Sequence, residues 1–237
     1  DGMLHAFDAA NGNELWTYIP TPVLPNLWKL ADTAYASNHA NFINGSPVVT
    51  DICSANCANQ VTDTNPPVWK TILVGGLSGG GRGYYALDVT DPSSPSLLWE
   101  YTNADDADLG YSYGNPVVTK KSDGTWVVVF ASGYNNSSSG SGRGYLYVLN
   151  ANSGAQLSKI DTNVGDATTP SGLAKISAWV DNLDRNNTAG YVYGTDLLGN
   201  VWRFDINAAS AFKFAVLRDA LSAVQPITTA PELGLVN

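Results

Sequence analysis

The stretch Tyr145-Leu146-Tyr147-Val148-Leu149-Asn150 recurs with the same side-chain pattern at three other places in the chain. The other copies are Met3-Leu4-His5-Ala6-Phe7-Asp8, Gly83-Tyr84-Tyr85-Ala86-Leu87-Asp88 and Asn200-Val201-Trp202-Arg203-Phe204-Asp205. Each copy has a ring three residues before the closing Asp or Asn, and a large apolar residue directly before it. Because alternate side chains of a β-strand share a face, this spacing predicts a half-buried strand that ends at a turn.

Turn-forming residues follow three of these segments. Asn11 and Gly12 come after the first copy, Asp91 and Pro92 after the second, and a run of Asn, Ser and Gly over 150–154 after the third. These residue types adopt the backbone angles that a tight reversal needs. An aromatic-ended strand follows the first two turns, so each copy is predicted to be the first half of a hairpin.

A second repeated element lies upstream of these hairpins. Gly45-Ser46-Pro47-Val48-Val49-Thr50 matches Gly114-Asn115-Pro116-Val117-Val118-Thr119, with Pro where a strand begins and a missing N–H is tolerated. Apolar runs over 69–76 and 126–133 come next, and a looser third copy follows residue 170. Each full unit therefore predicts four antiparallel strands, which is the blade of a β-propeller. A β-sandwich would not repeat its strands in this four-part order.

The repeat predicts an all-β chain that forms one β-propeller domain over residues 1–237. Blade units are expected at roughly 1–30 (partial), 42–101, 111–160, 170–210 and 225–237 (partial), so we expect a fragment truncated at both ends. The closing residues of successive copies are further apart than the about 40–45 residues of a plain blade. Long loop insertions are therefore expected at 17–41, 51–66, 77–83, 135–144 and 181–190. Residues 208–224 carry a weak helical pattern, and 225–232 are predicted to open another unit.

The composition excludes several classes of protein. The 237 residues carry 21 acidic and 12 basic side chains, a net charge of −9, and 44% of them are hydrophobic. Low charge content with many aromatic residues excludes intrinsic disorder, and no apolar run reaches the about 18 residues that a transmembrane helix needs. An acidic chain without basic clusters is also a poor binder of nucleic acid or of anionic lipid.

The only two cysteines, Cys53 and Cys57, lie close together in the chain. We expect a local disulfide formed in an oxidising compartment, which closes a very small loop instead of joining distant strands. A zinc site is the alternative, but it needs two further ligands. The two histidines, His5 and His39, lie in unrelated segments.

No catalytic constellation is found in the sequence. His5 takes the ring position of the strand repeat, which predicts a packing role, and His39 has no Gly-x-Ser-x-Gly partner for nucleophilic catalysis. The loops at 78–83 and 137–144 are rich in Gly and Ser, but each leads into a strand and not into a helix N-terminus. They are therefore predicted to be hairpin loops and not phosphate sites.

Charged residues outside the repeat are expected in structural roles. Arg82, Arg143 and Arg203 are predicted to pair with blade carboxylates, and for Arg203 we expect an ion pair between blades. The acidic segment Asn103-Ala104-Asp105-Asp106-Ala107-Asp108 is predicted to be a solvated turn.

Three segments of the chain match motifs of a known family. They are Asp1-Gly2-Met3-Leu4-His5-Ala6-Phe7-Asp8, Gly114-Asn115-Pro116-Val117 after Leu109-Gly110-Tyr111, and Tyr193-Gly194-Thr195-Asp196-Leu197-Leu198-Gly199-Asn200-Val201-Trp202-Arg203-Phe204-Asp205. They resemble the C-terminal propeller of the PilY/PilC family, the tip-associated adhesin and assembly proteins of type IV pili. The resemblance runs over nearly the whole chain, and its last motif is long and specific.

The resemblance implies a modified seven-bladed, quinoprotein-like propeller with large insertions. It implies a place outside the cell, at the pilus tip or outer-membrane surface of a Gram-negative bacterium. The implied role is non-enzymatic and covers pilus biogenesis, counteraction of retraction, adhesion and twitching motility. The implied partners are pilin subunits, other pilus-tip proteins and a host-cell or surface ligand.

In several members of that family, an Asp-rich loop before the last motif binds calcium. The corresponding region here is 181–190, where Leu183 and Arg185 interrupt the expected alternation of oxygen ligands. Calcium takes six to eight oxygen ligands, and four side chains could supply oxygens if the loop folds back on itself: Asp181, Asp184, Asn186 and Thr188. A polar turn that joins two blade strands is the alternative.

Two other functions share parts of this pattern. Residues 6–16 fit the Ala-x-Asp-x-x-x-Gly-x-x-x-Trp pattern of quinoprotein (PQQ) dehydrogenase propellers and of outer-membrane assembly lipoproteins. In such blades the Gly turns the hairpin and the Trp docks between blades. A quinone enzyme would also be expected to carry an adjacent Cys-Cys pair and calcium-linked carboxylates around the ring axis, and this sequence shows neither.

Overall fold

The computed structural model describes residues 2–182 and 186–234. Strands account for nearly all of its regular structure, with two 3-10 segments, η1 (Thr21–Ala31) and η2 (Ser78–Gly80). The all-β prediction is therefore confirmed. No helix among these residues has the length and apolar character needed to cross a membrane.

The first complete blade, blade A, contains strands β3 (Val48–Ala55), β4 (Val68–Gly76), β5 (Gly83–Asp88) and β6 (Ser96–Thr102). These strands form an antiparallel sheet in chain order. In the centre of the sheet, Val74 of β4 pairs with Ala86 of β5. The predicted four-part unit is present, and the strand repeat forms its third strand.

Blades B and C repeat this arrangement. Blade B contains β7 (Val117–Lys120), β8 (Trp126–Ala131), β9 (Tyr145–Asn150) and β10 (Gln156–Asp161). Blade C contains β11 (Lys175–Asn182), β12 (Asn186–Thr195), β13 (Asn200–Asp205) and β14 (Ser210–Val216). Thr188 of β12 pairs in parallel with Lys120 of β7, and this pair joins the two blades into one eight-stranded sheet.

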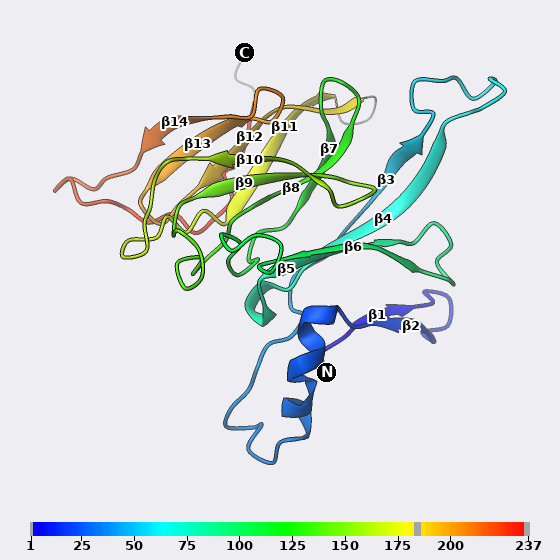
Figure 1. The fold of residues 1–237 in the computed structure, drawn as a ribbon, viewed down its shortest axis with the longest axis horizontal. Coiled ribbons are helices and arrows are strands. Elements are labelled where there is room, and N and C mark those ends of the chain that lie inside the picture. The colour runs from blue at the N-terminus through cyan, green and yellow to red at the C-terminus, as the bar shows by residue number, and fades with distance from the viewer. Residues whose placement is uncertain (1, 183–185, 235–237) are drawn as a thin grey trace.

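The N-terminal hairpin packs on the outer face of blade A. It consists of β1 (Leu4–Phe7) and β2 (Glu14–Tyr18), which pair antiparallel and are followed by η1. Trp16 and Tyr18 pack against Tyr85 and Leu87 of β5. Figure 1 shows this blue hairpin below blade A, with the successive blades following in chain order toward the orange strands of blade C.

The blades stack through apolar side chains. Tyr84 of β5 stacks on Phe130 of β8 with ring centroids 4.1 Å apart, and the indole N–H of Trp99 donates to the carbonyl of Ala151 at 2.9 Å. In β9, Tyr147 faces blade A whereas Val148 faces blade C. Because both faces of blade B are covered, β8 and β9 are continuous apolar runs and not alternating ones.

The far face of blade C is open. Its exposed rings include Tyr191 of β12 together with Phe212 and Phe214 of β14, which are 55% and 59% exposed. The Arg203 guanidinium lies over Tyr191 and Phe212, 4.7 Å and 5.1 Å from the ring centroids. The expected ion pair between blades is therefore wrong: Arg203 points to the open face and has no ion pair among the described residues.

The expectations for the C-terminal part are also corrected. Within 208–224, where a weak helical pattern was expected, the chain forms β14 and a bridge between Arg218 and Val224. Phe212, Phe214 and Val216 alternate with smaller or polar residues, and this period of two lets the segment pair with the free edge of β13. Residues 225–234 contain no strand, although a strand was expected there. Instead, the Ile227 N–H donates to the Asp196 carbonyl, and the Thr195 hydroxyl at the end of β12 donates to the Thr229 carbonyl.

Candidate functional site

Loops meet on one face of the stacked blades, which we call the loop face. It is formed by the connections within blades that follow β4, β8 and β12, and by the connections between blades at 103–116 and 162–174. Loops held by a rigid sheet are the usual location of binding residues. The polar contacts that hold this face are therefore the first candidate for a functional site.

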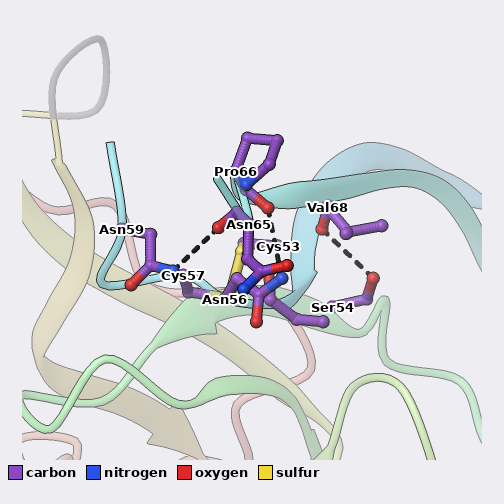
Figure 2. Close-up of a disulfide and its surroundings, with 9 residues drawn as sticks. Cys53, Ser54, Asn56, Cys57, Asn59, Asn65, Pro66 and Val68 are labelled. Carbon is purple, nitrogen blue, oxygen red and sulfur yellow. Dashed lines mark hydrogen bonds between the residues drawn. A yellow bond between two sulfur atoms is a disulfide. The ribbon is translucent and has the colours of Figure 1, made fainter. Parts of the chain in front are cut away.

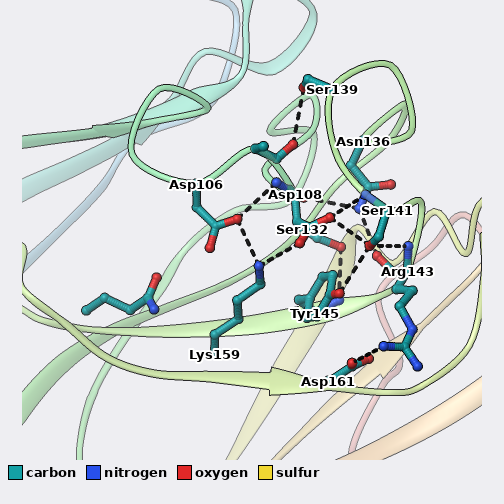
Figure 3. A network of polar contacts seen from close by, with 12 residues as sticks. Asp106, Asp108, Ser132, Asn136, Ser139, Ser141, Arg143, Tyr145, Lys159 and Asp161 are labelled. Carbon is teal, nitrogen blue, oxygen red and sulfur yellow. Dashed lines mark hydrogen bonds and ion pairs between the residues drawn. The ribbon is translucent and has the colours of Figure 1, made fainter. Parts of the chain in front are cut away.

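Lys159 of β10 links the connection at 103–116, which runs from blade A to blade B, to the last strand of blade B (Figure 3). Its Nζ lies 2.9 Å from Asp106 Oδ1 and 2.7 Å from Asp108 Oδ2, and both carboxylates are only 16% exposed. The same ammonium lies over the Tyr145 ring, 4.2 Å from the centroid. The prediction of a solvated acidic turn is wrong for these two residues, because a lysine distant in the chain partly buries and neutralises them.

The second carboxylate oxygen of Asp108 holds the Gly/Ser-rich loop of blade B. It accepts hydrogen bonds from the backbone N–H of Ser141 at 2.5 Å and from its hydroxyl at 2.7 Å. The Asn136 amide donates to the carbonyls of Asp108 and Arg143, at 3.1 Å and 2.7 Å. The loop at 135–144 is therefore a hairpin loop, as predicted, and it is anchored at several points.

The network shifts the ionisation of its members. Burial alone would raise the pKa of the Asp108 carboxyl, but hydrogen bonds from Lys159 and Ser141 outweigh it and hold that pKa below its usual value. Burial alone would lower the pKa of Lys159, and the two carboxylates instead raise it. Burial is the largest cause that raises the pKa of the Tyr147 hydroxyl far above its usual range, and the negative charge of Asp106 is the second. At neutral pH, Asp108 therefore stays ionised, Lys159 stays protonated and the Tyr147 hydroxyl stays neutral.

The predicted carboxylate pairing of the arginines is confirmed only for Arg143. Its guanidinium lies 2.8 Å from Asp161 Oδ2 and also donates to Asn163 Oδ1 at 2.9 Å. Arg82 has no ion pair among the described residues. It lies over the Tyr111 ring at 5.3 Å and donates to the Ser139 hydroxyl at 3.2 Å.

Asp196 occupies the turn between β12 and β13, in the longest sequence motif. Its side chain is fully buried and accepts hydrogen bonds from the Trp202 indole N–H at 2.8 Å and from the Asn200 amide at 2.9 Å. The backbone N–H groups of Leu198 and Asn200 donate to its other oxygen. A buried carboxylate with this many donors fixes a turn, so the motif acts structurally.

The predicted disulfide is present between Cys53 and Cys57 (Figure 2). It lies where β3 leaves blade A, on the long loop that returns to β4. Asn56 and Asn59 donate to the carbonyls of Pro66 and Asn65, and these bonds close the loop on itself. In the chain-entropy treatment, such a small ring adds about 2 kcal/mol to stability. The cysteines are therefore used in a disulfide and are not free to ligate zinc.

The proposed calcium residues do not lie in one ten-residue loop. Strands β11 and β12 extend into the region, and Asn182 pairs with Asn186. Asp181 belongs to β11, and Asp184 lies outside the described residues. Asn186 and Thr188 lie on β12, where the Thr188 hydroxyl donates to Asn186 Oδ1 at 2.6 Å. The structure thus brings two of the four residues together, at the end of a hairpin.

The two histidines lie in separate places. His5 is half-buried in β1, with Nδ1 3.4 Å from Glu14 Oε2 and its ring stacked near Phe7. His39 is exposed and packs against Tyr35. Over residues 2–182 and 186–234, no three His, Cys, Asp or Glu side chains are grouped so that they could hold a metal ion.

Sequence reasoning missed the Lys159 network. Lys159 lies 53 residues after Asp106, and a single lysine in a half-polar strand carries no local signal of its partner. The repeat offered one clue, because Asp106 and Asp108 precede the Leu109-Gly110-Tyr111 segment that opens blade B. An acidic segment that is partly buried between two blades needs a cation nearby to compensate the buried carboxylates.

Stacked four-stranded blades with long, anchored loops define this chain as a β-propeller. It belongs to the PilY1 beta-propeller domain family, whose model matches residues 1–232. The type IV pilus biogenesis factor PilY1 of Pseudomonas aeruginosa strain PAO1 is 35% identical over 98% of this chain and 21% of its own length. A PilY1 homolog of Xylella fastidiosa is 34% identical over all of this chain and 18% of its own length.

A solved structure shows the same fold. The crystal structure of the Pseudomonas aeruginosa PilY1 C-terminal domain matches 99% of this chain and 48% of the solved chain, with a TM-score of 0.77 and 31% identity. The chain therefore spans about half of that domain and about a fifth of the curated relatives.

Proposed function

We propose that this chain is the propeller part of a type IV pilus biogenesis factor and acts without catalysis. The observation that carries the proposal is the family match over residues 1–232, with relatives that are named type IV pilus biogenesis factors. The anchored loop face supports it, because such a surface can bind a partner without rearranging. The partners in this role are pilin subunits and other proteins of the pilus tip.

The finer role that we propose is surface adhesion and support of twitching motility from the pilus tip, outside the cell or on the outer-membrane surface. The Cys53–Cys57 disulfide supports an oxidising location, since disulfides persist outside the cytoplasm. The adhesive ligand in this role is a host-cell or abiotic surface component. The loop face and the disulfide loop are the parts of the chain that could meet it.

Complementation tests this function. A piliated Gram-negative strain that lacks its own biogenesis factor receives the full protein that carries this propeller. We expect surface pili, twitching zones and adhesion to return. A matched version with the 1–237 region deleted should restore none of them. Normal piliation by the deleted version would contradict the proposal, whereas restored pili without adhesion would limit the role to assembly.

We also propose calcium regulation at the β11–β12 hairpin. Asp181, Asn186 and Thr188 lie at the ends of the two strands, and Asp184 lies between them in the sequence. Isothermal calorimetry on the full protein should show calcium binding that Asp181→Ala and Asp184→Ala each weaken. Asp91→Ala, in an exposed turn of blade A, is the control and should have no effect. Unchanged calcium affinity in both hairpin variants would remove this site.

A further inference from the structure

Three tyrosines form a continuous row across the loop face. The Tyr113 ring lies between those of Tyr111 and Tyr134, with centroid distances of 6.3 Å and 5.5 Å. A backbone bridge holds the ends of the row, because Tyr111 N–H donates to the Tyr134 carbonyl at 2.8 Å and Tyr134 N–H to the Tyr111 carbonyl at 3.2 Å. The row crosses from the start of blade B to its β8–β9 loop, and its geometry is fixed by backbone.

Cavities open along this row. At one end a cavity of about 490 Å³ lies between η1 and the Gly79-Gly80-Gly81 turn, and Tyr111 is part of its wall. At the other end a cavity of about 600 Å³ is lined by Tyr113, Tyr134 and Leu197. A smaller polar cavity of about 180 Å³ shares Tyr113 and Lys175 with the second. The contact between the Tyr111 and Tyr113 rings links the first cavity to the other two, and we call the three cavities with the tyrosine row the tyrosine track.

The charge of the tyrosine track is opposite to that of the whole chain. Lys29, Arg82 and Lys175 line it, and among the described residues no Asp or Glu does. In a chain with 21 acidic side chains and a net charge of −9, this separation leaves a local site for anions.

None of these cations has a carboxylate partner among the described residues, although Arg82 is held by the Ser139 hydroxyl and the Tyr111 ring. The Lys29 ammonium has no hydrogen bond or ion pair among the described residues, and Lys175 donates only to the Tyr113 carbonyl, at 2.6 Å. By contrast, the ammonium groups of Lys70, Lys121 and Lys159 are paired with carboxylates. An anion that enters the track therefore displaces no internal ion pair.

Close backbone approaches hold the walls of the track in place. Gly80 lies so close to Phe42 that an added Cβ would be 1.8 Å from the Phe42 carbonyl oxygen. Asn135, which lines the larger cavity, has a left-handed backbone with φ 57°. Asn is among the residues other than glycine that adopt this conformation most readily, so it suits this turn. A preformed site loses less conformational entropy when it binds.

We propose that the tyrosine track binds an acidic polysaccharide, a chain of sugars that carries carboxylate groups. Tyrosine faces can pack against the apolar C–H faces of successive pyranose rings. Lys29, Arg82 and Lys175 bind the carboxylates by charge-assisted hydrogen bonds. The side-chain amides of Asn26, Asn41 and Asn135 can bond to sugar hydroxyls. The inference rests on the proposed adhesive function and names its ligand class.

The combination of cations and tyrosine rings favours this ligand over other anions. Cations beside a row of rings suit a polymer in which each sugar offers both a carboxylate and an apolar face. An acidic peptide could satisfy the cations but would leave the flat tyrosine faces without matching partners.

Binding is measured by calorimetry with the full protein that carries this propeller, using polygalacturonate, neutral dextran and polyglutamate as probes. We expect saturable binding of polygalacturonate, and weaker or absent binding of the other two polymers. Tyr113→Ala and Arg82→Gln should each weaken it about tenfold, and Tyr113→Phe should retain it. Tyr191→Ala and Arg218→Gln, of the same residue types away from the track, are the controls. Thermal unfolding confirms that every variant is folded.

Several outcomes would overturn the inference. They are absence of polygalacturonate binding, equal binding of polyglutamate, equal binding of dextran, and equal losses in the control variants. The complementation assay keeps this result separate from the proposed function. Tyr113→Ala should restore pili but not adhesion to polygalacturonate-coated surfaces. If the unaltered protein restores no pili, the biogenesis role fails whatever the polymer does.

Discussion

At the scale of single residues, Asp196 shows how one buried carboxylate organises a turn. It accepts bonds from the side chains of Asn200 and Trp202 and from two backbone N–H groups, and it has no exposed surface. Carboxylates are rarely buried unless their acceptor capacity is used. The position of Trp202 in β13 and the path of the β12–β13 turn both depend on it.

Replacing Asp196 with alanine should lower the free energy of unfolding by about 2–4 kcal/mol, because buried donors of Asn200 and Trp202 lose their acceptor. Urea denaturation measures the change. Asp205→Ala, at the other end of β13, removes an acceptor of two backbone N–H groups in a more exposed turn and should cost about 1 kcal/mol or less. Equal losses for the two variants would contradict the structural role of Asp196.

At the scale of elements, the connection at 103–116 is held to β10 by the Lys159 network and to the β8–β9 loop by Asp108. Tyr111 and Tyr113 lie in this same connection. The network therefore sets the position of the loop face relative to the sheet, although none of its ionised groups lies in the tyrosine track.

Stability should depend on pH through this network. The folded pKa of Asp108 is lowered, so its contribution is complete above the unfolded value of about 3.9 and is lost as pH falls through the folded pKa. The folded pKa of Lys159 is raised, so its contribution is complete below about 10.4 and is lost as pH rises through the folded pKa. Lys159→Met should cost about 1–3 kcal/mol between these limits.

Denaturation midpoints at pH 3, 5, 7 and 9 measure this dependence. Lys159→Met should also flatten the loss of stability between pH 5 and 3. The matched control is Lys121→Met, because the partner of Lys121, Asp123, is 57% exposed, and a much smaller effect is expected. An unchanged acid limb in Lys159→Met would show that the network does not stabilise the fold.

The elements that could be predicted from sequence are those with local signals. The ring spacing of Tyr85, Tyr147 and Trp202 marks the third strand of each blade, and all three residues are buried there. The Lys159 and Asp108 pairing could not be predicted, because it joins residues 51 positions apart. The helical expectation for 208–224 failed because alanines in that segment suit a helix, whereas the edge of β13 offered a strand partner.

The candidate sites also divide into those with local sequence signals and those that join distant segments. The disulfide between Cys53 and Cys57 could be predicted, since its partners are close in sequence. The tyrosine track could not, because Lys29, Arg82 and Lys175 come from three unrelated segments that only the stacking of blades brings together. The expected ion pair of Arg203 between blades failed for a related reason. The local sequence does not show which face of a blade packs against a neighbouring blade and which face is open.

At the scale of the whole molecule, the blades are held by covered sheet faces. Positions two residues before the closing acid or amide, Ala86 and Val148, face the next blade in blades A and B. The equivalent residue in blade C is Arg203, on the open face with its aromatic neighbours. The same pattern of strand positions thus produces two buried seams and one exposed surface.

Substitutions in a buried seam and on the open face should lower the free energy of unfolding by different amounts. Phe130→Ala, in the seam between blades A and B, should lower the free energy of unfolding by about 3–5 kcal/mol, since the ring is fully buried. Phe214→Ala, on the open face, should cost about 1 kcal/mol or less in the 237-residue chain. Urea denaturation compares them. A similar loss for both would mean that the open face is covered in solution.

The pair between Thr188 and Lys120 bears on how the molecule carries load. The strands of each blade are contiguous in the chain, so a pulling force can detach one blade while the others keep their own ladders. Blades B and C are different, because β7 and β12 pair directly and the Thr119 hydroxyl and Asn187 amide add two bonds across the same joint. Under tension this backbone pair gives blades B and C a joint of a kind that the seam between blades A and B lacks among the described residues, because the strands of blade A form a separate sheet.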